Sequence, residues 1–214
     1  MRIGVLISGR GSNLQAIIEG IERKEVAARI VVVISNDPAA FGLKRAEKAG
    51  IPTVVVSHKD YGTRQEFETR LIEELKARHV ELVVLAGFMR VLTSHFLKAF
   101  PKRVVNIHPA LLPSFPGVGV QQKAVDYGVR FSGCTVHFVD EGIDSGPIIA
   151  QAVVPVFPDD TGETLADRIL KMEHKIFPKV IHWIATGRVR VEGRRVWVEG
   201  ALRNEEWAGM EPSL

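Results

Sequence analysis

Cysteine is almost absent from this sequence, and long apolar runs are absent altogether. A single cysteine, Cys134, in 214 residues excludes an intrachain disulfide and a multi-cysteine zinc site. No stretch reaches the roughly 18 apolar residues of a membrane-spanning helix. The apolar run over residues 3–7 stops at Ser8, too early for a secretory signal peptide. We therefore expect a cytoplasmic protein with no membrane partner.

An excess of one charge sign is missing as well. Lys and Arg number 28 while Asp and Glu number 25, which leaves a formal net charge of +3. So small a surplus gives little affinity for a phosphate backbone, and we expect no nucleic-acid partner. The hydrophobic share of 46% and the charged share of 25% are those of a globular chain. The length suits one domain with its own core.

Short apolar runs alternate with helical patterns along the first half of the chain. Such alternation is typical of βαβ units, whose parallel strands are buried on both faces. We therefore expect an α/β fold: an open, twisted, mostly parallel (mixed) sheet with helices on both faces. The expected strands cover residues 2–7, 29–35, 53–56, 82–85 and 103–107, and the expected helices cover residues 13–23, 41–49, 63–78 and 94–100.

The pattern changes after residue 107, where a proline-rich loop follows the fifth strand. Pro178 is expected to interrupt the last long helix. Alternating apolar residues around Gly193 predict a terminal hairpin. We expect one domain over residues 1–188 and a hairpin-and-tail extension over residues 189–214. The expected elements are a helix at 121–127, strands at 133–139 and 147–156, a helix at 164–185 and the hairpin at 189–198.

Two glycines mark the segment between the first strand and the first helix, Ser8-Gly9-Arg10-Gly11-Ser12-Asn13. They let backbone N–H groups approach a ligand, and the helix N-terminus adds partial positive charge, so the segment suits a phosphate. It is neither a Walker loop nor a GxGxxG fingerprint, because Leu14 stands at the third glycine position. A tight turn in which Ser12 caps the helix is an equally good interpretation.

The fifth strand ends in Asn106-Ile107-His108-Pro109. Ligands of open α/β sheets bind at the carboxyl ends of the strands, and the two-residue period puts Asn106 and His108 on one side. An amide donor beside an imidazole suits proton transfer or an oxyanion. In an arbitrary sequence, a hydrogen-bonded strand end is the commoner reason for such a pair.

Three carboxylates then fall within five residues, at Asp140, Glu141 and Asp144. The spacing is not that of an EF-hand, so we expect no metal. A solvated acidic loop is one interpretation. The other is catalytic: a carboxylate facing His108 would favour the imidazolium form, which together with Asn106 would make an oxyanion hole.

Together these segments resemble the glycinamide ribonucleotide transformylases, which belong to the folate-dependent formyltransferase superfamily. The resemblance covers about residues 1–187 and implies the Rossmann-like formyltransferase fold. Residues 106–113 and the Asp144 loop match the wider superfamily, and the Ser-Gly-x-Gly-Ser-Asn loop matches the ribonucleotide enzymes. The other matching pieces are Ser35-Asn36, Ala86-Gly87-Phe88-Met89-Arg90, Pro116-Gly117, Val136-His137-Phe138-Val139-Asp140, Gln151 and Glu173-His174.

The resemblance implies a reaction in purine synthesis. The formyl group of 10-formyltetrahydrofolate passes to the glycyl amine of 5′-phosphoribosylglycinamide, with no metal. Asn106 and protonated His108 would donate hydrogen bonds to the oxyanion. Asp144 would hold His108 charged and help move a proton from the attacking nitrogen to N10 of the folate. The partners would be small molecules only, and the enzyme a monomer or homodimer.

The resemblance also implies two sets of binding residues. The sequence differs from the family pattern at Gly119, where many family members carry a histidine. The substrate set is Gly11, Ser12 and Asn13 for the phosphate, Glu173 for the ribose hydroxyls, and Gly87, Met89 and Pro109. The folate set is Met89, Arg90, Val91, Leu92, Asn106, Val139, Asp140 and Glu141, with Arg64 for the carboxylate of the folate tail.

Three alternatives remain open. A methionyl-tRNA formyltransferase carries a similar His-Pro element, but it needs a tRNA-binding domain for which we expect no room. A formyltetrahydrofolate hydrolase shares the catalytic set, but it typically has an N-terminal regulatory domain, and the first strand here begins at residue 2. A non-catalytic nucleotide-binding module would use only the glycine loop.

Overall fold

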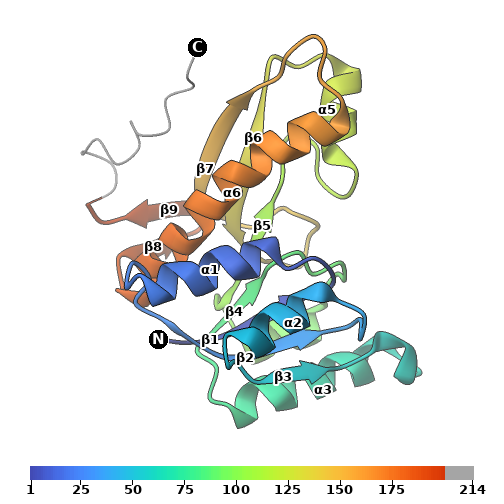
Figure 1. Ribbon diagram of the computed structural model, residues 1–214. Coiled ribbons are helices and arrows are strands. Elements are labelled where there is room, and N and C mark those ends of the chain that lie inside the picture. Colours follow the sequence, from blue (N-terminus) through green and yellow to red (C-terminus); the bar gives the residue numbers. More distant parts are fainter. Residues whose placement is uncertain (201–214) are drawn as a thin grey trace.

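Strands from both halves of the chain form one seven-stranded sheet (Figure 1). The computed structural model describes residues 1–200, so the expected tail over residues 201–214 lies outside the described part. The strand order is β3-β2-β1-β4-β5-β6-β7. The strands are β1 (Arg2–Ile7), β2 (Arg29–Ser35), β3 (Thr53–Val55), β4 (Leu82–Leu85), β5 (Val104–His108), β6 (Phe131–Phe138) and β7 (Ile148–Pro155).

The expected mixed, mostly parallel sheet is confirmed. The first five strands pair in parallel, while β6 runs antiparallel to β5 and β7 antiparallel to β6. β1 lies between β2 and β4, and its residues 3–7 are buried. Because both faces of β1 are covered, its sequence is apolar without alternation.

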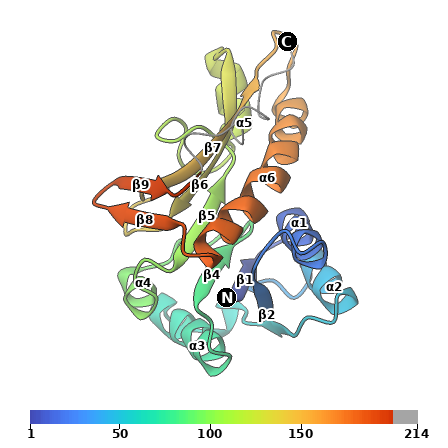
Figure 2. The same cartoon turned by 90° about the vertical axis from the view of Figure 1, so that its left-hand side faces the viewer.

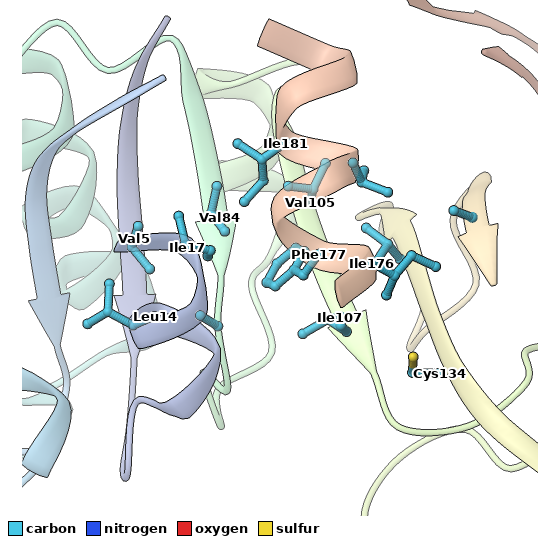
Figure 3. Packing of buried hydrophobic residues seen from close by; sticks show 14 of the residues in the cluster. Val5, Leu14, Ile17, Val84, Val105, Ile107, Cys134, Ile176, Phe177 and Ile181 are labelled. Carbon is cyan, nitrogen blue, oxygen red and sulfur yellow. The ribbon is translucent and has the colours of Figure 1, made fainter. Parts of the chain in front are cut away.

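Helices cover both faces of the sheet (Figures 1 and 2). On one face, Phe177 and Ile181 of the long last helix pack towards Ile17 and the strand residues Val84 and Val105 (Figure 3). None of the helices that the structure describes has the length and apolar character of a membrane span. The first face carries α1 (Ser12–Glu22), α2 (Phe41–Lys48), α5 (Val120–Tyr127) and α6 (Gly162–Ala185), and the other carries α3 (Arg64–Ala77), α4 (Ser94–Ala99) and the short 3₁₀ helix η1 (His58–Asp60).

Two local expectations are wrong. Pro178 does not interrupt the last helix, because α6 continues from Gly162 to Ala185. Pro178 and its neighbour Phe177 are buried, and this packing offsets the hydrogen bond that proline removes. Ser12 does not cap α1: the N-cap is Gly11, whose φ of 69° is left-handed, and no side chain caps the helix.

The terminal hairpin is confirmed as β8 (Val189–Glu192) paired antiparallel with β9 (Arg195–Val198). Val198 is buried in the same core as α6, so the hairpin is packed onto the domain. Cys134 is buried on β6, and burial raises the pKa of its thiol.

Gly133 on β6 generates a stability prediction. A Cβ atom there would lie 1.9 Å from the Ala152 carbonyl oxygen on β7, so the strands would have to separate. We expect Gly133→Ala to lower the free energy of unfolding by about 3 kcal/mol, the upper end of typical overpacking costs, in urea denaturation. Gly62→Ala is the control, because its nearest atom would lie at 3.5 Å. Equal stability of the two variants would contradict this account of the β6–β7 contact.

Candidate functional site

A pocket of about 400 Å³ opens at the carboxyl ends of β4 and β5. Its rim is apolar and open to solvent: the side chains of Met89, Val118 and Ile143 are 67%, 75% and 61% exposed. An apolar wall with a few polar groups at its base suits a flat organic ligand. The residues expected from the sequence that line it are Gly87, Met89, Arg90, Val91, Leu92, Asn106, His108, Pro109, Val139, Asp140 and Asp144.

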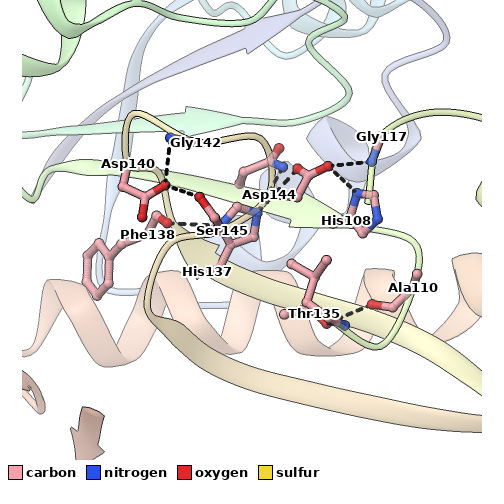
Figure 4. Close-up of polar contacts among 12 residues, drawn as sticks. His108, Ala110, Gly117, Thr135, His137, Phe138, Asp140, Gly142, Asp144 and Ser145 are labelled. Carbon is pink, nitrogen blue, oxygen red and sulfur yellow. Dashed lines mark hydrogen bonds and ion pairs between the residues drawn. The ribbon is translucent and has the colours of Figure 1, made fainter. Parts of the chain in front are cut away.

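His108 and Asp144 meet at the wall of this pocket (Figure 4). His108 is 4% exposed, and its Nδ1 lies 3.3 Å from Asp144 Oδ2. Its Nε2 lies 2.8 Å from the Phe115 carbonyl oxygen. Both ring nitrogens therefore face acceptor oxygens, an arrangement that only the imidazolium form satisfies fully. The same carboxylate oxygen accepts a 2.9 Å hydrogen bond from the Gly117 amide.

Asn106 is oriented by His137, which lies opposite it in the β5–β6 pair. His137 Nδ1 lies 2.9 Å from the Phe138 carbonyl oxygen, so Nδ1 carries the proton. Burial lowers the pKa of His137, and the ring is neutral with a lone pair on Nε2. That lone pair accepts a 3.2 Å hydrogen bond from Asn106 Nδ2. The second amide hydrogen of Asn106 stays available to a ligand.

The loop that carries Asp144 is tied from several sides. Asp140 Oδ1 accepts from Ser145 Oγ at 2.6 Å and from the Gly142 amide at 3.1 Å (Figure 4). Arg194, at the turn of the β8–β9 hairpin, donates to the Ser145 carbonyl at 2.7 Å. Asp144 itself has a left-handed φ of 51°. The carboxylate is thus held next to His108 by contacts on both sides of it.

The glycine loop and Glu173 meet at the start of α1. Asn13 Nδ2 donates a 2.7 Å hydrogen bond to Glu173 Oε2, and burial raises the pKa of Glu173. Gly11 packs so closely on α2 that a Cβ would lie 2.6 Å from Gly42 Cα. The loop amides therefore sit at a fixed helix N-terminus. A hollow of about 340 Å³ beside it is lined by Ser12, Gln15, Ala16, Glu19, Arg23, Arg45 and His174.

Five of the expected residues line neither hollow: Gly11, Asn13 and Glu173, which meet at the start of α1, and also Arg64 and Glu141. Arg64 begins α3 and is exposed, and Glu141 is exposed between Asp140 and Gly142; neither lines the pocket or the hollow beside α1. Gly119, the departure from the family pattern, lines the pocket as the left-handed N-cap of α5, with φ 67°. A histidine there would be strained.

Three groups that shape the site could not be identified as site groups from the residues alone. These are the His137 ring, the Phe115 carbonyl and the Gly117 amide. Two of them are backbone groups, which carry no signal in a side-chain pattern. Strand alternation predicts on which side of β6 the His137 side chain lies, but it does not predict that His137 pairs with Asn106 of β5. Within residues 1–200, no three His, Cys, Asp or Glu side chains gather in a way that could hold a metal ion.

Comparisons with known proteins agree with this geometry. The family model described as Formyl transferase matches residues 1–181. Phosphoribosylglycinamide formyltransferase from Escherichia coli is 42% identical over 200 residues, and the match covers 94% of each chain. The crystal structure of glycinamide ribonucleotide transformylase 1 from Symbiobacterium toebii has a TM-score of 0.91 at 50% identity, covering 92% of this chain and 93% of that one.

A longer relative matches as well. The trifunctional purine biosynthetic protein adenosine-3 of Drosophila melanogaster is 50% identical over 188 residues, which are 87% of this chain and 14% of that protein. This chain thus spans between about a seventh and a fifth of the length of such relatives, while it spans nearly all of the bacterial ones. By its sequence and its fold, the chain belongs to the formyl transferase family and, within it, to the phosphoribosylglycinamide formyltransferases.

Proposed function

We propose that this chain transfers the formyl group of 10-formyltetrahydrofolate to the glycyl amine of 5′-phosphoribosylglycinamide, a step of purine synthesis. The products are formylglycinamide ribonucleotide and tetrahydrofolate. The observation that carries the proposal is the pairing of the buried His108 with the partly buried Asp144, beside Asn106 in an apolar pocket. The names of the bacterial relatives support the same reaction.

The chemistry divides into an attack and a proton transfer. The neutral amine attacks the formyl carbon, and the carbonyl oxygen becomes an oxyanion. The amide of Asn106 and the imidazolium of His108 donate to that oxygen. The 3.3 Å separation between His108 Nδ1 and Asp144 Oδ2 is long for a charge-assisted hydrogen bond. The Nδ1–H group can therefore also donate to the oxyanion of the substrate.

The second half of the reaction expels the folate. Asp144 accepts the proton that the attacking nitrogen loses, and water passes it to N10 of the folate. The bond between the formyl carbon and N10 then breaks as the carbonyl re-forms. No covalent intermediate on the protein is needed, because the substrate supplies its own nucleophile. An oxyanion donor is typically worth about 10²–10³ in rate.

Each substrate has its own part of the site. The amides of Gly11, Ser12 and Asn13 bind the phosphate at the N-terminus of α1, where the helix dipole favours an anion. Glu173 binds the ribose hydroxyls. The pterin occupies the apolar pocket, with the backbone of residues 89–92 and 139–141 along its sides, and Arg64 meets the folate tail.

The working unit follows from the same proposal. Residues 1–188 form the catalytic domain, and the enzyme acts in the cytoplasm on small molecules, without nucleic acid, as a monomer or homodimer. Sedimentation at assay concentrations distinguishes the two oligomeric states.

The experiment that tests the function is an absorbance assay of tetrahydrofolate release. Purified protein receives 10-formyltetrahydrofolate with and without 5′-phosphoribosylglycinamide. We expect release only when the ribonucleotide is present. Release without it would replace the proposal with a hydrolase, and no release in either sample would replace it with a binding module.

Replacing His108 separates catalysis from binding. We expect His108→Ala to lower kcat by about 10²–10³-fold, because an oxyanion donor is lost. Calorimetric Kd for the ribonucleotide should stay within about threefold, since its phosphate binds at the glycine loop. His95→Ala on α4, outside the pocket lining, is the matched control and should keep full activity. Full activity of His108→Ala would refute the role given to His108.

The pH profile tests attack by the neutral amine and the role of Asp144. The rate should rise with pH as the substrate amine loses its proton, near the α-amino reference of about 8. Asp144→Asn removes the carboxylate that accepts the proton of the attacking nitrogen, so kcat should fall at every pH. A wild-type rate that stays flat from about pH 5 to 10 would contradict this mechanism.

Burial of His137 predicts a pH effect on stability. Because burial lowers its folded-state pKa, the unfolded chain takes up a proton first as the pH falls below 6.5. The folded state therefore loses up to about 1.4 kcal/mol between pH 7.5 and 5.5 from this group. We expect His137→Gln to lose less stability than the wild type over that interval in urea denaturation. Parallel losses would show that His137 is protonated in the folded state.

A further inference from the structure

Ser8 connects the glycine loop to the segment that lines one side of the pocket. It ends the run of β1 and donates its backbone N–H to the Gly87 carbonyl at 3.0 Å. Its side-chain Oγ accepts a 2.8 Å hydrogen bond from the Met89 amide. Two bonds thus join one residue to both ends of the segment 87–89, and Gly87 and Met89 both line the pocket.

Asn36, just after β2, fixes the direction of the Ser8 hydroxyl. Asn36 is 7% exposed, and its Oδ1 accepts from Ser8 Oγ at 2.5 Å. Its Nδ2 lies 3.3 Å from His58 Nδ1 in the 3₁₀ helix η1. A hydroxyl has one hydrogen, so donation to Asn36 leaves the Oγ lone pairs for the Met89 N–H. The bonds run in one direction, from Met89 through Ser8 and Asn36 to His58.

The direction of these hydrogen bonds decides which backbone N–H and C=O groups remain available to a ligand. The Met89 amide is occupied by Ser8, so it does not donate into the pocket. Gly87 has a left-handed φ of 77°, which turns the segment sharply. The wall at residues 87–89 is therefore a backbone turn whose orientation depends on the side chain of Ser8, the residue that follows β1.

We propose that Ser8, held by Asn36, is a positioning residue for folate binding. Its hydroxyl fixes the peptide plane at Met89 and with it the start of the pocket wall over residues 89–92. This inference rests on the proposed function for the identity of the ligand. It assigns a task to the side chain of Ser8 and to Asn36, neither of which touches a reacting atom.

The phosphate part of the site depends on other contacts. The Gly42 amide donates to the Gly9 carbonyl at 3.0 Å, and Arg45 Nε donates to the Arg10 carbonyl at 3.0 Å. These bonds hold the glycine loop against α2 and do not pass through the Ser8 hydroxyl. Loss of that hydroxyl should therefore affect the two substrates unequally.

The test compares Ser8→Ala with a matched control, Ser35→Ala. Ser35 is also buried next to Asn36, but its hydroxyl bonds only the Asp37 backbone, donating to its carbonyl at 2.8 Å. We expect Ser8→Ala to raise KM for 10-formyltetrahydrofolate about tenfold, because the Met89 N–H and the amide oxygen of the buried Asn36 both lose their partner. Gly87 and Met89 also belong to the expected ribonucleotide set, but the phosphate and the ribose are held at the glycine loop and Glu173, so KM for the ribonucleotide should change less than about threefold. We expect a similarly small change in kcat. Ser35→Ala should leave both KM values unchanged.

Two further measurements make the result decisive. Ser8→Thr keeps the hydroxyl and should restore the folate KM. Hydrogen exchange at the Met89 amide should be slow in the wild type and in Ser8→Thr but fast in Ser8→Ala, whether or not the protein turns over. Hydrogen exchange at Met89 can be measured even if the protein shows no formyl transfer. A failure of the proposed function can therefore be distinguished from a failure of the positioning role of Ser8. Equal rises in both KM values, or unchanged exchange at Met89, would overturn the positioning role.

Discussion

The antiparallel pairing of β5 with β6 is the constraint on which the site depends. β5 is the last parallel strand, and it brings Asn106 and His108 to the carboxyl edge of the sheet. β6 runs back beside it and sets His137 opposite Asn106. The same strand carries Thr135, whose buried hydroxyl donates to the Ala110 carbonyl at 2.7 Å and fixes the turn after His108 (Figure 4). One strand pair therefore orients both the amide and the imidazole.

Burying an ion pair is favourable only when its remaining hydrogen bonds are made. The His108 ring meets the Phe115 carbonyl on one side and Asp144 on the other, and Asp144 also accepts from the Gly117 amide. The acceptors and donors come from two loops, one after β5 and one after β6. The two loops thus stabilise each other's conformation, because either one alone would leave a buried group without its partner.

The sheet and nearly every helix could be predicted from the sequence, since strands buried on both faces and amphipathic helices leave clear patterns. Asn106 and His108 could be placed together because strand alternation is local. The continuity of α6 through Pro178 could not be predicted, because the packing around this residue comes from segments distant in the sequence, which include α1, β6 and β7. The position of His137 opposite Asn106 could not be predicted, because the register of the β5–β6 pair depends on contacts that no short segment contains.

The position of the Asp144 carboxylate is fixed by the conformation of its own loop. The left-handed φ of 51° at Asp144 costs backbone energy that glycine would not incur. Two hydrogen bonds keep the loop in this conformation. The Ser145 hydroxyl donates to Asp140 within the loop, and Arg194 of the terminal hairpin donates to the Ser145 carbonyl. In the proposed reaction, a carboxylate fixed in this way stabilises the positive charge on the His108 ring and on the attacking nitrogen without having to reorganise. The hairpin after α6 therefore belongs to the structure that supports the site, although it contributes no residue to the pocket lining.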